Sequence, residues 1–209
     1  FHPKHKLLFA RDPEDPNAWA TDNPLSGIGW VEANAWQGTF GLSHAIGELA
    51  DMMGGPSVLA DKLNFAFEQA APSHFVYTYG GGYVSYANQP GCSNAHVFNH
   101  VGFPWLSQYW VRRVSRQAYG GTNPNEGYGG HDEDQGQMGG VSALMKLGLF
   151  SLRGTSSQRP IYELTAPEFE NITIHLDPKY YSGKSFRIKA HDVAEENCYI
   201  QRAHLNGSP

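Results

Sequence analysis

The sequence predicts a mixed α and β fold in which helices come first and short antiparallel strands follow. Up to about residue 152, apolar residues recur at helical spacing between long, glycine-rich loops. Beyond that point, apolar and polar residues alternate along short runs, which is the period of a strand. We therefore divide the chain into a helical region with long loops, 1–152, and a strand region, 153–209.

The helical region is expected to contain four helices, at about 35–53, from Pro56 onward, at 104–119 and at 136–150. Proline at the start of the second and third helices, and paired glycines after the first and third, are the usual signals for helix ends. The stretches 71–100 and 120–134 are long loops by ordinary standards. Loops of that length in compact domains tend to carry function.

The strand region is expected to hold antiparallel strands near 172–176, 186–190 and 198–200. Asp177-Pro178 and Ser182-Gly183 supply turns between the first two runs. The sequence thus describes helical hairpins followed by a small β unit.

Composition excludes several classes of function. The net charge is −5, and apart from three arginines on one helix the basic residues form no dense block, which argues against nucleic-acid binding. No apolar run approaches the roughly 20 residues that span a membrane. Cys92 and Cys198 lack the spacing of a zinc site, and a disulfide between them stays open. The chain starts at Phe1 and ends in a linker-like stretch, so we expect a piece of a longer polypeptide.

Three polar loop segments each lead towards a helix: 30–37, 87–94 and 129–138. If those helices pack in parallel around a barrel, the loops meet at one rim, and Glu32 faces Asp132 and Asp134. Hydrolysis of a glycosidic bond needs such a pair, because one carboxylic acid protonates the leaving oxygen while another carboxylate activates water.

Simpler interpretations stand beside this one. Glu32 could cap the following helix or pair with an arginine, and the Asp132–Asp134 run could be a solvated turn or a helix start. An EF-hand calcium loop is discounted there, since the later bidentate glutamate is missing. His96 and His100 lie four residues apart, as zinc ligands do, but without an HExxH pattern they fit packing or hydrogen bonding better.

Four segments in order resemble glycoside hydrolase family 92. Glu32-Ala33-Asn34-Ala35-Trp36-Gln37 is similar to the family's E-G-N-A-W-Q, and the other matching segments are 99–105, 132–138 with 147–150, and 169–174 continuing to 207. Each motif alone is weak, but their order and approximate spacing hold from about Gly29 to Gly207.

The resemblance implies the C-terminal part of an (α/α)6 barrel followed by strands of a β-sandwich. It implies a secreted, periplasmic or cell-surface enzyme that releases mannose from α-mannosides of glycans by exo-acting, inverting hydrolysis with a Ca²⁺ ion. By motif position, Glu32 would be the general acid and Asp134 the general base, assisted by Asp132. The missing N-terminal part of the same polypeptide would complete the pocket.

Three further residues are expected to contact substrate: Trp36, Asn88 and Gln89. The amide oxygens of Asn88 and Gln89 are hard donors of the kind calcium prefers, so we also expect these two residues as metal ligands.

The loop at 88–93 departs from the family pattern, which commonly reads N-E-P or H-E-P followed by S-H-H. Here it reads Asn88-Gln89-Pro90 and then Gly91-Cys92-Ser93. Glutamine carries neither charge nor a transferable proton, so strict α-1,2 specificity is not expected. Two alternatives follow: a mannosyl-1-phosphodiester hydrolase, if position 89 rather than 32 supplies the acid, and a catalytically inactive carbohydrate-binding module.

Overall fold

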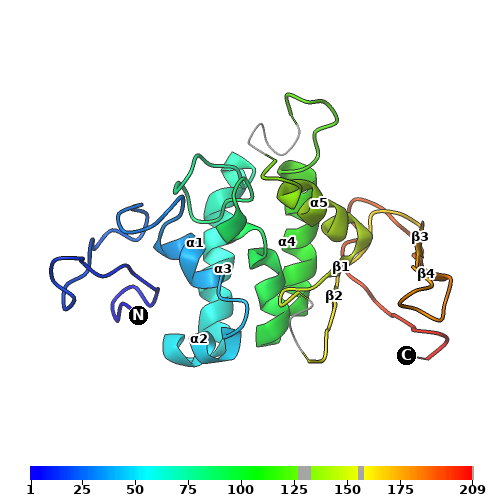
Figure 1. The fold of residues 1–209 in the computed structure, drawn as a ribbon, viewed down its shortest axis with the longest axis horizontal. Coiled ribbons are helices and arrows are strands. Elements are labelled where there is room, and N and C mark those ends of the chain that lie inside the picture. The colour runs from blue at the N-terminus through cyan, green and yellow to red at the C-terminus, as the bar shows by residue number, and fades with distance from the viewer. Residues whose placement is uncertain (127–132, 155–157, 209) are drawn as a thin grey trace.

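The structure is a computed structural model that describes residues 1–126, 133–154 and 158–208. The helices form the centre of the molecule (Figure 1). The N-terminal segment lies at one end of the long axis, and strands β3 and β4 lie at the other. The expected order of helices followed by antiparallel strands is confirmed.

The α-helices are α1 (Ala35–Phe40), α2 (Ile46–Met53), α3 (Pro56–Ala70), α4 (Pro104–Gln117) and α5 (Gln137–Leu147). Three 3-10 helices lie between α3 and α4: η1 (Ala71–Ser73), η2 (Gln89–Gly91) and η3 (Asn94–Val101). The strands are β1 (Leu149–Phe150), β2 (Glu163–Leu164), β3 (Asn171–His175) and β4 (Ser185–Lys189). No helix in the described part of the chain is both long and apolar enough to cross a membrane.

The prediction of one continuous helix over 35–53 is wrong. The chain breaks between Phe40 and Ile46, where Gly41 caps α1 and its backbone passes close to the Pro90 carbonyl in η2. Glycine is a poor helix former, which favours the end of α1 at this position. The break lets α1 present its N-terminal loop while α2 turns away to pack on α3.

The helical core is aromatic. Phe67 on α3 lies among buried rings with centroid separations of 5.1–6.4 Å, contributed by Phe75, Tyr86, Phe98 and Trp110. Phe75, Tyr86 and Phe98 all lie between α3 and α4, so this cluster fixes the long connection after α3 against the two helices.

The strand region contacts the helices through a buried arginine. Arg112 on α4 donates to the carbonyl oxygens of Ala194 at 2.8 Å, Ala166 at 3.1 Å and Pro167 at 3.2 Å. Since burying a cation is costly without partners, these bonds define where the loops of the strand region sit. The strands themselves pair antiparallel, β1 with β2 and β3 with β4.

His96 and His100 serve packing and hydrogen bonding, as their position predicts. His96 stacks on Phe150 with ring centroids 3.9 Å apart. His100 Nε2 lies 2.7 Å from Glu163, which also accepts the Leu152 backbone N–H at 3.0 Å. Burial opposes ionisation of Glu163, but these hydrogen bonds outweigh it and the pKa of Glu163 is lowered. The run at 198–200 forms no strand, and Cys92 and Cys198 are free thiols.

Candidate active site

The loop before α1 is organised by Asn34, which caps the helix. Its Oδ1 accepts the backbone N–H groups of Trp36 and Gln37 at 2.9 and 3.2 Å. Its Nδ2 donates to the carbonyl oxygens of Gly80 and Gly82 at 2.9 and 2.8 Å. Because Asn34 satisfies the helix end, Glu32 is not needed as a cap.

Glu32 is exposed and stands in the left-handed region of backbone space, with φ of 52°. The side-chain amide of buried Asn88 donates to both the Glu32 carbonyl at 3.0 Å and its carboxyl Oε2 at 3.2 Å. Within the described part of the chain, Glu32 forms no ion pair. A non-glycine residue at positive φ costs free energy, and such residues cluster at functional sites.

Glu133 and Asp134, in the loop before α5, have different hydrogen-bond partners. Glu133 caps the helix, accepting the Gly139 N–H at 3.0 Å and also the Gly136 N–H. Asp134, with φ of 55°, accepts a hydrogen bond from Gln89 Nε2 at 2.8 Å on its Oδ2. Asp132 lies outside the described residues. The helix-start interpretation therefore fits Glu133, whereas Asp134 faces a neighbouring loop.

Two consecutive residues thus hold the two candidate carboxylates. Asn88 binds Glu32, and Gln89 binds Asp134, so side chains from distant parts of the sequence meet at the start of η2. In these contacts each carboxylate accepts from a neutral amide rather than from an arginine or lysine. The arrangement can present an acid and a base to one substrate.

The Cys92 side chain holds η2 in place. Its Sγ donates to the Asn88 carbonyl at 3.3 Å and lies 3.8 Å from both the Tyr119 hydroxyl and Met138 Sδ. Burial raises the pKa of the Cys92 thiol to about 12, with Asp134 adding to the shift, so the group stays neutral. The loop that carries Asn88 and Gln89 is therefore fixed to the end of α4 and to α5.

The side chain of Trp36, an expected substrate contact, packs against other aromatic rings. Its ring packs with Phe40, Phe65 and Tyr83 at centroid separations of 5.0–6.5 Å, and Lys62 Nζ lies 4.7 Å above it. Only 6% of its surface is exposed. Its role in binding substrate remains a prediction.

Calcium fits the described residues only in part. Ca²⁺ takes six to eight oxygen ligands, whereas Asn88 and Gln89 together offer two side-chain amide oxygens, and Asn88 Oδ1 already accepts the Gln89 N–H at 3.0 Å. Among the described residues, three or more His, Cys, Asp or Glu side chains come together at metal-binding distance elsewhere in the molecule and not at this loop.

The sequence did not predict that Asn88 and Gln89 act on Glu32 and Asp134. The only signal was their place in a motif-bearing loop, which pointed to substrate and calcium instead. These contacts depend on how three loops pack together in space, and the spacing of residues along the chain does not predict that packing.

A pair of carboxyl groups that can flank one bond is what hydrolysis of a glycosidic bond requires. The whole chain, residues 1–209, matches the model of the glycosyl hydrolase family 92 catalytic domain, and the chain belongs to that family.

One curated relative is an uncharacterized secreted glycosidase from Arthroderma benhamiae, 27% identical over 178 residues, covering 84% of this chain and 20% of the relative. A solved family GH92 α-mannosidase from Bacteroides thetaiotaomicron has a TM-score of 0.81 at 22% identity, covering 99% of this chain and 26% of its own. The GH92 glycosyl hydrolase ccman5 has a TM-score of 0.71 at 23% identity, covering 97% of this chain and 29% of its own. The likeness supports the expected fold, the later part of an (α/α)6 barrel followed by strands, and shows that the chain spans roughly a quarter of these proteins.

Proposed function

We propose that the protein containing this chain is an exo-acting, inverting α-mannosidase that releases mannose from glycans, with a linkage preference that is not strictly α-1,2. The family membership of residues 1–209 supports hydrolysis of a glycosidic bond. A solved relative is described as an α-mannosidase. Secretion is part of the proposal and is supported by the description of the fungal relative.

The observation that carries the proposal is the pairing of Glu32 and Asp134 through Asn88 and Gln89. In this scheme Glu32 donates a proton to the departing oxygen. Asp134 takes a proton from the attacking water on the opposite face of the mannose, and Asp132, two residues earlier in the chain, assists it. Inversion requires that the two carboxyl groups stand roughly 6.5–9.5 Å apart, so that water fits between them and the sugar.

Calcium belongs to the proposal as well. When bound, the ion would hold the vicinal hydroxyls of the mannose. The described residues offer Gln89 Oε1 and the Asn88 oxygen as neutral donors, and the remaining ligands would come from sugar, water and other parts of the protein. The division of the chain at about residue 152, into barrel helices and a β-strand region, is likewise proposed.

Replacement of Glu32 by Gln tests the acid in the full-length protein. An alkyl mannoside needs protonation of its leaving oxygen, whereas an aryl mannoside with an acidic phenol does not. Since general acid catalysis contributes about 10²–10⁴-fold, we expect kcat/KM to fall by that factor for the alkyl substrate and far less for the aryl one. Equal losses on both substrates would contradict the assignment.

The same measurement separates the alternatives. A mannosyl-1-phosphodiester hydrolase would cleave its substrate without help from Glu32, because phosphate leaves well unprotonated. A carbohydrate-binding module would release no mannose at all. Asp134→Asn in the mannosidase should abolish turnover on every substrate, since activation of water is needed whichever group leaves.

A further inference from the structure

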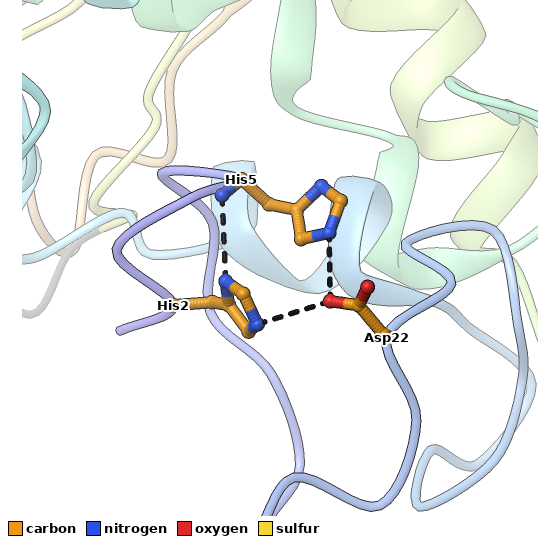
Figure 2. A group of neighbouring side chains, drawn as sticks. All are labelled: His2, His5 and Asp22. Carbon is orange, nitrogen blue, oxygen red and sulfur yellow. Dashed lines mark hydrogen bonds and ion pairs between the residues drawn. The ribbon is translucent and has the colours of Figure 1, made fainter.

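A cluster of two histidines and one aspartate lies in the N-terminal segment (Figure 2). His2 Nε2 is 3.3 Å from Asp22 Oδ1, and His5 Nε2 is 3.1 Å from the same oxygen. One ligand atom from each of the three residues can be chosen so that all lie within 4.8 Å of one another. None of these residues takes part in the candidate active site.

From this geometry we infer that His2, His5 and Asp22 form a binding site for a divalent transition-metal ion of the zinc class. Imidazole nitrogen and carboxylate oxygen are the donors that Zn²⁺ prefers after thiolate. Ligands about 2.0–2.1 Å from one ion at tetrahedral angles lie about 3.3–3.4 Å from each other. The two measured nitrogen-to-oxygen separations are close to that value.

The rings are held in place before any ion arrives. His2 is buried and lies 4.7 Å from Phe9 and 5.0 Å from Trp19 by ring centroids, while His5 stacks on Phe9 at 5.2 Å. A backbone turn closes the segment, with the His2 N–H donating to the Leu7 carbonyl at 2.8 Å. Ligands fixed by packing lose little conformational freedom on binding.

The two imidazoles are not needed to neutralise Asp22. Lys4 Nζ already donates to the other carboxylate oxygen, Oδ2, at 2.9 Å, and this bond also orients Oδ1 towards the rings. Hydrogen-bonded carboxylates of this kind are usual around protein metal ions.

Binding requires both histidines to change tautomer, because His5 Nε2 donates to Asp22 Oδ1 only when it carries the proton, and that proton must also move to Nδ1. His2 Nδ1 now accepts the His5 backbone N–H at 3.4 Å, so a neutral ring carries its proton on Nε2. For Nε2 to bind the ion, that proton must sit on Nδ1, and the contact with the backbone N–H is given up. The contact is longer than the usual 2.7–3.2 Å of an N–H hydrogen bond, so little is lost. Asp22 is exposed, which leaves a fourth position open to water.

The test uses the full-length protein without an affinity tag, stripped with a chelator and then supplied with excess Ca²⁺ so that calcium sites stay filled. Zn²⁺ binding is measured by equilibrium dialysis with metal analysis, and Co²⁺ is used in parallel for its visible absorption. We expect wild type to bind one more Zn²⁺ per chain than His5→Ala and Asp22→Ala, each of which should weaken this site at least tenfold. The cobalt bands of the site should disappear in both variants.

His204→Ala, at an exposed histidine far along the chain, is the matched control and should bind as wild type does. His2→Ala is avoided because its buried ring supports the fold. His5→Gln and Asp22→Asn provide milder variants, and the circular dichroism spectrum verifies that each remains folded. Equal zinc stoichiometry and affinity in wild type and in the His5 and Asp22 variants would overturn the inference, as would a wild type that binds no zinc.

Discussion

The contact between Asn88 and Glu32 makes a quantitative prediction about the proposed acid. Asn88→Ala removes one hydrogen bond to the Glu32 carboxyl, at 3.2 Å, and one to its backbone carbonyl, at 3.0 Å. A hydrogen bond between neutral partners, such as an amide and a protonated acid, contributes about 0.5–1.5 kcal/mol. If the whole of that contribution serves to orient the acid, kcat/KM on an alkyl mannoside falls about 2- to 13-fold, at 1.36 kcal/mol per tenfold.

A double-mutant cycle isolates this effect from damage to the fold. In a Glu32→Gln background the acid is already absent, so adding Asn88→Ala should change kcat/KM little, which gives a coupling of about 0.5–1.5 kcal/mol between the two sites. The control Asn197→Ala, which removes a 2.7 Å hydrogen bond to the Asp192 carbonyl at the other end of the chain, should leave kcat/KM unchanged. Equal losses from Asn88→Ala in both backgrounds would refute the idea that Asn88 works through Glu32.

Three further predictions concern the scaffold. Phe67→Ala, at the centre of the aromatic cluster, should lower the free energy of unfolding by about 3–5 kcal/mol in urea denaturation, whereas Phe169→Ala at an exposed ring should stay within about 0.5 kcal/mol. Burial lowers the pKa of His96 from 6.5 to about 3, so the folded protein does not take up a proton that the unfolded chain binds. The free energy of unfolding should therefore fall by up to about 1.4 kcal/mol per pH unit as the pH is lowered from 6.5 to 3. The fall should be less steep in His96→Leu and the same as wild type in His204→Ala. The Cys92 thiol, whose pKa is raised to about 12, should resist thiol reagents at pH 7 in the native protein and react once it is unfolded; rapid native labelling would contradict its buried position.

Local sequence predicted the elements whose ends carry their own signals. Pro56 and Pro104 open α3 and α4 where expected, and alternating apolar residues predicted the β3–β4 pair. The break between α1 and α2 escaped prediction because apolar residues continue at helical spacing across it. At the end of α1, the signals are Gly41 and the short segment before Ile46, which periodicity alone does not weigh.

The candidate site was predicted in part for a similar reason. Motif position pointed to Glu32 and Asp134, and the structure brings both to neighbouring residues of one loop. The donors that hold them, Asn88 and Gln89, were assigned to substrate and calcium, because sequence gives the residue types of a loop but not the direction of its side chains. The left-handed backbone conformation at Glu32 and Asp134 could not be predicted either, because in a sequence it is mainly glycine that indicates such a conformation.

The most direct test of the mechanism is the distance between two carboxyl groups in a crystal structure of the full-length protein with a mannose-like inhibitor bound. A water-activated displacement predicts Glu32 beside the glycosidic oxygen and Asp134 on the other face of the ring, with their carboxyl carbons roughly 6.5–9.5 Å apart. Both groups on one face of the sugar, or a separation of about 5 Å that fits a covalent intermediate instead, would contradict it.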